Sequence, residues 1–218
     1  GHEFHYYRAG SAASRMTPQF LPRDAIAAAK ILHVSAISQA ISENACETVL
    51  AAMDIAREAG VRVCFDTNLR LKLWPLDRAR EAIDAAITRA DILRPALDDA
   101  QTLTGLEDAD AIVDRFLAMG PKLVAMTMGK EGVLLADGAQ RHRIAAHRVQ
   151  ALDATGAGDT FNGAFLTRLI AGDRPLDAAR YANAAAALQT TGYGAVAPMP
   201  RPADVRRFLA QQAAQLEK

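Results

Sequence analysis

Short apolar runs alternate with amphipathic stretches through the first two thirds of the chain. The runs predict strands at 31–34, 61–65, 91–93, 122–128 and 132–136. The stretches between them have apolar residues at helical spacing and predict helices at 42–60, 79–90, 98–103 and 112–119. Strands that alternate with helices indicate an α/β fold with a mostly parallel sheet, covered by helices on both faces.

The last third of the chain has a different pattern, in which one helix follows another. Helices are predicted at 160–170, 176–189 and 203–216, with a Gly-Asp break at Gly172 and a loop over 192–202. At the other end, residues 3–8 are aromatic and alternating, as in an edge strand or a lid strand.

Composition bounds the class of protein. The 218 residues are 50% hydrophobic and 23% charged, as in a globular chain, and we expect a single domain over 1–218. A net charge of +0 gives no field that would hold nucleic acid or a membrane, so neither is expected as a partner. Two cysteines without metal-ligand spacing fit a reducing, cytoplasmic setting.

The most informative stretch is DATGAGD at 153–159, which runs directly into an apolar helical segment. Gly156 and Gly158 leave no side chain in the way of a tight turn. A small-residue loop that enters a helix directs free N–H groups and the positive end of the helix dipole at one point, which suits a phosphate. The loop is not a Walker A motif, because no Gly-Lys-Ser/Thr follows.

Asp159 ends this loop, although a carboxylate beside a phosphate is repulsive. Two interpretations are open. Asp159 is a base for the group that attacks the phosphate, or it caps the helix, since Asp is a favourable N-cap residue.

The stretch 153–159 and the helix start TFNGAF after it resemble the C-terminal signature of the ribokinase-like (PfkB) carbohydrate kinases. MTMGKEG at 126–132 and ANAAA at 182–186 resemble that family's nucleotide-side turn and helix. FDTNLR at 65–70, LW at 73–74, YYR at 6–8 and GSA at 10–12 are similar to the family's 2-keto-3-deoxygluconate kinase branch. The resemblance covers residues 4 to about 202.

The resemblance implies a three-layer α/β/α sandwich and a set of functional residues. Asp159 would be the general base, and Gly156, Ala157 and Gly158 would bind the transferring phosphoryl group. The residues implied to bind the sugar are Arg70, Arg8, Tyr6, Asp66 and Asn68, with the arginines facing a carboxylate. Those implied to bind ATP are Thr127, Gly129, Gly132 and Asn183.

Two cation sites follow from the same resemblance. The family's Asn-x-x-Glu motif, linked to Mg²⁺, falls on 96–99, where Ala96 replaces the Asn and Asp99 takes the acidic place. Asp153 and Thr155 match positions that hold a monovalent cation such as K⁺. A turn braced by their own side chains is the alternative for these two residues.

The implied activity is ATP-dependent phosphorylation of 2-keto-3-deoxygluconate to its 6-phosphate, by a homo-oligomer. The alternatives are another sugar kinase, such as a fructokinase, or an inactive nucleotide-binding fragment. Family members have a longer N-terminal part, so we expect an N-terminally incomplete fold in which 1–15 is a remnant of the lid. A chain of this extent is expected to bind ATP weakly, to turn over sugar poorly and to self-associate.

Overall fold

The computed structural model describes residues 5–138 and 140–216. The chain forms two compact units, Gly1–Met126 and Thr127–Lys218, and each is described by itself. Within the described ranges, no helix is both long and apolar enough to cross a membrane.

Parallel strands form the centre of the first unit. They are β1 (Ile31–Ser35), β2 (Arg62–Asp66), β3 (Ile92–Arg94) and β4 (Leu123–Thr127), whose last residue opens the second unit. Each strand pairs in parallel with the next one along the chain. The register aligns Ser35 with Asp66, and Asp66 with Arg94, so three polar residues share the carboxyl edge of the sheet.

Helices connect these strands, as expected for parallel pairing. Ser42 caps the longest by accepting a hydrogen bond from the Ala45 N–H at 3.0 Å, and Gly105 ends another in the left-handed conformation at φ +72°. The helices of this unit are α1 (Arg23–Ala27), α2 (Ala36–Gln39), α3 (Glu43–Glu58), α4 (Leu76–Ile87), α5 (Leu97–Thr104) and α6 (Ala109–Ala118), with short 3₁₀ turns at Ala13–Arg15 and Pro18–Phe20.

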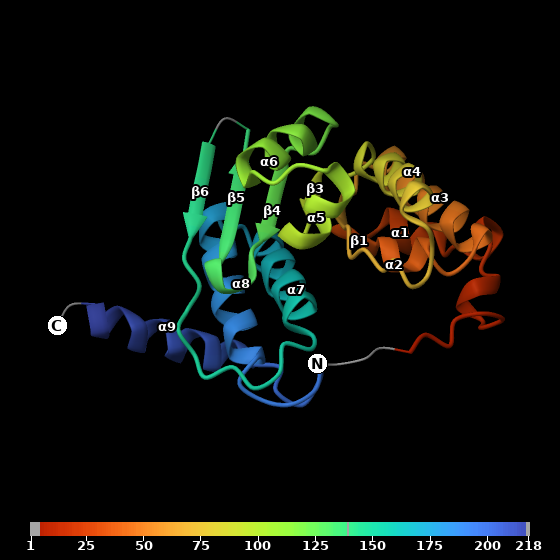
Figure 1. The fold of residues 1–218 in the computed structure, drawn as a ribbon. Coiled ribbons are helices and arrows are strands. Elements are labelled where there is room, and N and C mark those ends of the chain that lie inside the picture. The colour runs from red at the N-terminus through yellow and green to blue at the C-terminus, as the bar shows by residue number, and fades with distance from the viewer. Residues whose placement is uncertain (1–4, 139, 217–218) are drawn as a thin grey trace. The chain divides into compact units, whose positions relative to one another are not determined.

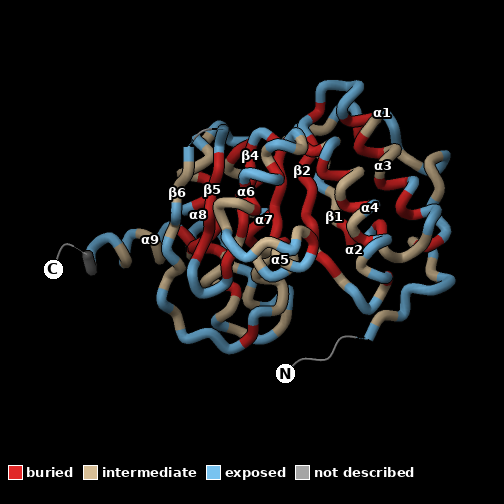
Figure 2. The backbone as a smooth tube through the Cα atoms, turned by 45° about the horizontal axis from the view of Figure 1, so that its top comes forward, coloured by how far each residue is buried: buried red, intermediate tan, exposed pale blue. Residues whose placement is uncertain are grey.

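Burial differs along the sheet of the first unit. After its first residue β2 is buried throughout, and β3 is buried at each of its three positions (Figure 2). β1 was expected to be a buried strand, but its residues are only half-buried and His33 is exposed. Its pairing within the described residues is with β2 alone, which leaves β1 at the edge.

The second unit combines a β-hairpin with three helices. β5 (Val133–Asp137) pairs antiparallel with β6 (Gln140–Ile144), and α7 (Ala157–Ile170) and α8 (Pro175–Gln189) pack together beside them (Figure 1). α9 (Pro202–Leu216) packs on α8 through Val205, which lies against Ala184 and Ala185. The small alanines of α8 let its neighbours approach closely on several sides.

The predicted α/β class and the mostly parallel strand pairing are confirmed. Each of the five predicted strands and each of the seven predicted helices is present, within a few residues of its expected bounds. β6, α1 and α2 were not predicted. The lid strand over 3–8 is wrong for residues 5–8, which are irregular, and its first two residues lie outside the described ones.

Candidate active site

The loop before α7 has the geometry of an anion site. Gly156 is the N-cap of α7 and has φ +77°, a left-handed conformation that favours glycine. A Cβ atom at Gly156 would lie 3.0 Å from the Ala195 Cα atom, so the loop is also too crowded for a side chain there. The backbone conformation and the close packing therefore both favour glycine at this position.

The first turn of α7 presents backbone N–H groups. The Thr160 N–H makes the first helical hydrogen bond, to the Gly156 carbonyl at 2.8 Å, and the Ala157 N–H donates to the Ala154 carbonyl at 3.1 Å. Helix geometry leaves the N–H groups of Gly158 and Asp159 without an acceptor inside the helix. They lie at the positive end of the α7 dipole, where a phosphoryl group would be stabilised.

Asp159 is exposed and is the third residue of α7. The capping interpretation is wrong, because Gly156 is the N-cap residue and no side chain caps this helix. The Asp159 carboxylate has no hydrogen bond or ion pair with any described residue. It is therefore available to accept a proton.

Asp153 braces the same loop. One carboxylate oxygen accepts hydrogen bonds from the Thr155 N–H at 2.9 Å and the Thr155 hydroxyl at 2.7 Å. The other accepts the Gly194 N–H at 2.8 Å. This is the braced turn that the sequence left open as an alternative to a cation site.

The nucleotide-side candidates lie along β4, β5 and α8. Thr127 ends β4 and is half-buried, while Gly129 is exposed and opens a 3₁₀ turn, Gly129–Glu131. Gly132 has φ +95°, and a Cβ atom there would fall 2.0 Å from the Ile144 carbonyl oxygen. Gly132 thus allows the start of β5 to approach the end of β6.

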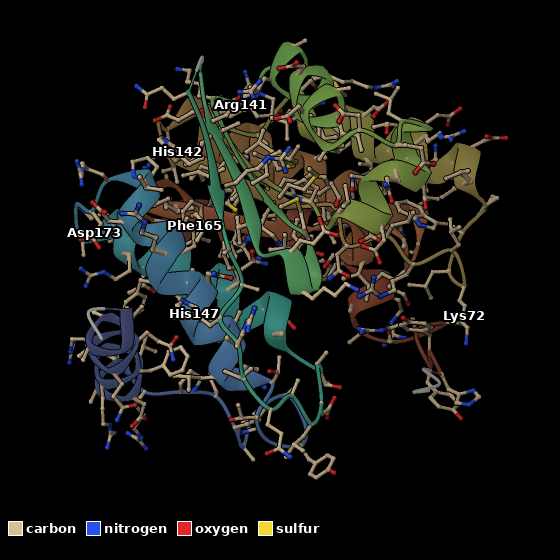
Figure 3. The ribbon with its side chains drawn as sticks, turned by 60° about the vertical axis from the view of Figure 1, so that its left-hand side comes forward. Lys72, Arg141, His142, His147, Phe165 and Asp173 are labelled. Atoms are coloured by element: carbon tan, nitrogen blue, oxygen red, sulfur yellow. The ribbon has the colours of Figure 1, made fainter. Side chains whose placement is uncertain are left out.

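Asn183 ties Ala145, just after β6, to α8. Its side-chain amide, buried in the helix packing, donates to the Ala145 carbonyl at 2.8 Å. Two residues later His147, labelled in Figure 3, packs edge-on against Phe208 of α9. Their ring centroids are 5.1 Å apart. Asn183 therefore fixes the start of the segment that leads to the loop at 153–159, which is called the phosphate loop below for its anion-site geometry.

The sugar-side candidates of the first unit follow β2. The Asp66 carboxylate accepts the Asn68 N–H at 3.0 Å, and Asn68 has φ +20°, at the edge of the left-handed region. Arg70 is half-buried and donates to the Leu69 carbonyl at 2.6 Å. It forms no ion pair at hydrogen-bonding distance with a carboxylate of the described residues, so most of its guanidinium N–H groups are available to a ligand.

Asp99, at the start of α5, contacts the same loop. It accepts the Leu69 N–H at 3.0 Å. Burial raises the pKa of Asp99 to about 6, and the nearby carboxylate of Asp98 adds to the rise, whereas the Leu69 N–H and Arg70 oppose it. A partly desolvated carboxylate of this kind is stabilised by an incoming cation.

The described residues contain no group of three or more metal-ligating side chains. Mg²⁺ in phosphoryl-transfer sites is commonly held by one or two carboxylates together with substrate phosphates, and a single carboxylate at Asp99 fits that pattern.

Tyr6 and Arg8 lie on the irregular segment that begins the described chain. Tyr6 is half-buried and Arg8 is exposed. The structure thus brings Asp66, Asn68, Arg70 and Asp99 together in the first unit. It brings Asp153, Thr155, Gly156 and Asp159 together in the second.

Two residues near these clusters were missed in the sequence. Arg94 forms a buried ion pair with Asp66, and Gln189 binds the backbone of the phosphate loop. Arg94 had a signal, because a charged residue that ends a buried strand needs a partner. Gln189 had no such signal, because a polar residue after an apolar run is common at the end of a helix.

The family model for pfkB family carbohydrate kinases matches residues 2–202. The chain is 37% identical to probable fructokinase-5 of Arabidopsis thaliana over 216 residues, covering 95% of this chain and 66% of the relative. It is 33% identical to 2-dehydro-3-deoxygluconokinase of Bacillus subtilis over 210 residues, covering 95% and 64%. The chain therefore spans about two thirds of the length of the curated relatives it matches.

Solved structures with a similar fold are consistent with this family match. The PfkB protein from Polaromonas sp. JS666 has a TM-score of 0.83 and 30% identity, covering 93% of this chain and 65% of that one. A double mutant of fructokinase from Vibrio cholerae O395, in fructose, ADP and potassium ion bound form, has a TM-score of 0.80 and 30% identity, covering 88% and 64%. The ribokinase-like fold is confirmed, and this chain belongs to the pfkB family of carbohydrate kinases.

Proposed function

We propose that the protein phosphorylates 2-keto-3-deoxygluconate at its terminal hydroxyl, with ATP as the phosphoryl donor. The observation that carries the proposal is Asp159, an exposed and unpartnered carboxylate in the first turn of a helix whose N–H groups suit a phosphate. A carboxylate at this point would be repelled by the phosphate, so its presence favours a catalytic role for it. That role is the one of general base, which takes the proton from the attacking hydroxyl.

The step balances as an in-line displacement. The sugar hydroxyl oxygen forms a bond to the γ-phosphorus of ATP, and the bond from that phosphorus to the β–γ bridging oxygen breaks. Asp159 takes the hydroxyl proton, and ADP leaves. The N–H groups of Gly156 and Gly158 stabilise the phosphoryl oxygens during transfer, with Ala157 in the turn between them.

The residues proposed to bind ATP and Mg²⁺ come from the family resemblance. ATP would lie along Thr127, Gly129, Gly132 and Asn183, while Asp99 would supply one carboxylate to Mg²⁺. A bound Mg²⁺ would neutralise charge that develops on the phosphates.

Arg70 supports an acidic sugar as the substrate. Arg70 is half-buried, lies just past the carboxyl end of a parallel strand and forms no ion pair at hydrogen-bonding distance with a carboxylate of the described residues. A guanidinium fork matches a carboxylate with two parallel hydrogen bonds. Arg8 and Tyr6 would complete the sugar's surroundings, with Asp66 and Asn68 shaping the loop.

A fructokinase is the second candidate, because the 37% identical relative carries that name. Fructose has no carboxylate, so a fructokinase would leave Arg70 without a ligand partner. The two candidates therefore differ in what Arg70 does.

An assay of ADP release, coupled to a reporter enzyme, tests the proposal. The protein in the longest form that its gene encodes is assayed beside this 218-residue chain, with ATP, Mg²⁺ and either 2-keto-3-deoxygluconate, fructose, ribose or no sugar. The proposal predicts a higher kcat/KM with 2-keto-3-deoxygluconate than with fructose or ribose.

A preference for fructose would replace the substrate assignment with the second candidate. ATP binding without turnover of any sugar, in both forms, would favour the nucleotide-binding alternative and contradict kinase activity. ATP hydrolysis without sugar is the background to be subtracted.

A further inference from the structure

Gln189 is the last residue of α8, and its side-chain amide lies among three backbone carbonyl oxygens. Its amide nitrogen lies 3.1 Å from the Thr155 oxygen, 3.0 Å from the Gly194 oxygen and 3.2 Å from the Ala195 oxygen. The residue is fully buried, at 0% exposure. One buried NH₂ group thus joins the phosphate loop to the loop that follows α8.

The orientation of this amide is determined by its surroundings. The Gln189 side-chain oxygen is buried and has no hydrogen-bond partner. Turning the amide over would place that oxygen against three carbonyl oxygens, which are acceptors as well. The nitrogen therefore faces the carbonyl oxygens. The hydrogen bonds that it donates to them outweigh the free-energy cost of leaving the side-chain oxygen without a partner.

Carbonyl oxygens that converge on one point, with a carboxylate close by, are the ligands that hard cations prefer. The resemblance to the family implies a monovalent cation at Asp153 and Thr155. The residues present do not fit one, because the Gln189 nitrogen already occupies the point that the Thr155 and Gly194 oxygens share. Both carboxylate oxygens of Asp153 are also used by N–H or O–H donors.

We propose that the side-chain amide of Gln189 takes the place of a monovalent cation, so that the phosphate loop keeps its shape without K⁺. The amide supplies positively polarised hydrogens at the point where the ion would supply a charge. It holds the Thr155 carbonyl, one residue before the Gly156 turn, against the loop that carries Gly194 and Ala195.

The contact at Gly156 is part of the same bridge. The Gly156 Cα lies so near Ala195 that even a Cβ atom would be crowded, and this approach lies beside two of the carbonyls that Gln189 binds. Without a positive group between them, the facing carbonyls repel one another and the loops separate. The first turn of α7 would then present its N–H groups less well to a phosphate.

The test compares Gln189→Ala with Gln189→Met in this 218-residue chain. Alanine removes the donor and leaves room for an ion, whereas methionine removes the donor but fills the space. Thermal unfolding and MgATP binding are measured in KCl and in tetramethylammonium chloride at equal ionic strength. The larger cation cannot enter the site.

The expected wild-type melting temperature is the same in both salts. Gln189→Ala should melt several degrees lower in tetramethylammonium and recover, with saturation, as KCl is added. Gln189→Met should melt lower in both salts without recovery. The affinity for MgATP should change in the same way as the melting temperature. It should be equal in both salts for the wild type, reduced in tetramethylammonium and restored by KCl for Gln189→Ala, and reduced in both salts for Gln189→Met.

Three results would overturn the proposal: selective stabilisation of the wild type by K⁺, a Gln189→Ala variant as stable as the wild type, or a destabilised Gln189→Ala variant that K⁺ does not restore. If Gln189→Ala does not fold, Gln189→Ser is measured in its place, since it leaves a smaller hole. None of these readouts requires sugar turnover, so failure here leaves the proposed kinase activity untouched.

Discussion

Arg94 and Asp66 form a buried ion pair at the carboxyl edge of the parallel sheet, between the last residues of β3 and β2. Their side chains are only 7% and 2% exposed. The strand register places them directly beside each other. Because the second carboxylate oxygen of Asp66 accepts the Asn68 N–H, the pair also fixes the turn that leads to Arg70.

Breaking this pair should destabilise the first unit. Arg94→Met leaves the buried Asp66 carboxylate without its cation, a change that costs about 3–5 kcal/mol in comparable buried pairs. We expect the free energy of unfolding, measured in urea, to fall by an amount in that range.

The double variant Asp66→Leu with Arg94→Met is the control, because removing both charges removes the unpaired ion. It should recover part of the lost stability. An Arg94→Met protein with wild-type stability would show that water, rather than Arg94, satisfies Asp66.

Asp159→Asn should separate catalysis from binding. The substitution keeps the size of the side chain and removes the base, so kcat should fall by about 10²–10⁴-fold in the longest natural form of the protein. The Kd for MgATP, measured by calorimetry, should stay the same or decrease, since a negative charge leaves the phosphate site. Near-normal kcat would refute the assignment of Asp159 as the base.

His147 should make stability depend on pH. Burial lowers the pKa of His147, so the folded protein holds this imidazole neutral more strongly than the unfolded chain does. The unfolded state binds the extra proton, and stability is therefore lost as pH falls below the unfolded value of about 6.5.

The measurement is the drop in melting temperature between pH 7.5 and pH 5.5. It should be smaller in His147→Phe, which keeps an aromatic ring against Phe208 and cannot titrate. Equal drops in the wild type and the variant would show that other groups carry the dependence.

The sequence patterns predicted the elements whose apolar positions repeat strongly. Ser42 and Gly105 marked helix ends that the structure has within one or two residues, because capping chemistry is local. β6 was missed because an edge strand that reads QRHRI lacks an apolar face, and its pairing with β5 is visible only in three dimensions.

The candidate site also contains some residues that could be predicted from local sequence and others that could not. The turn at Gly156 and the helix start after it were predictable because the glycines and Asp159 are contiguous in sequence. Arg94 and Gln189 act on residues 28 and 34 positions away, Asp66 and Thr155, so their roles depend on strand register and on how a helix end packs. The monovalent-cation site at Asp153 and Thr155 was expected from the family resemblance alone, whereas the contacts of Gln189 with three carbonyl oxygens are visible only in the structure.

Arg70→Lys tests the central claim most directly, that this is a kinase for an acidic sugar. The variant and the wild type are compared by their KM values for 2-keto-3-deoxygluconate, fructose and ATP in the ADP-release assay. A hydrogen bond to a charged group contributes about 1.5–3 kcal/mol, and an ammonium cannot reproduce the guanidinium fork. The account predicts a KM for 2-keto-3-deoxygluconate about one to two orders of magnitude higher, with little change for fructose or ATP. An equal rise in all three KM values, or no rise for the sugar acid, would contradict it.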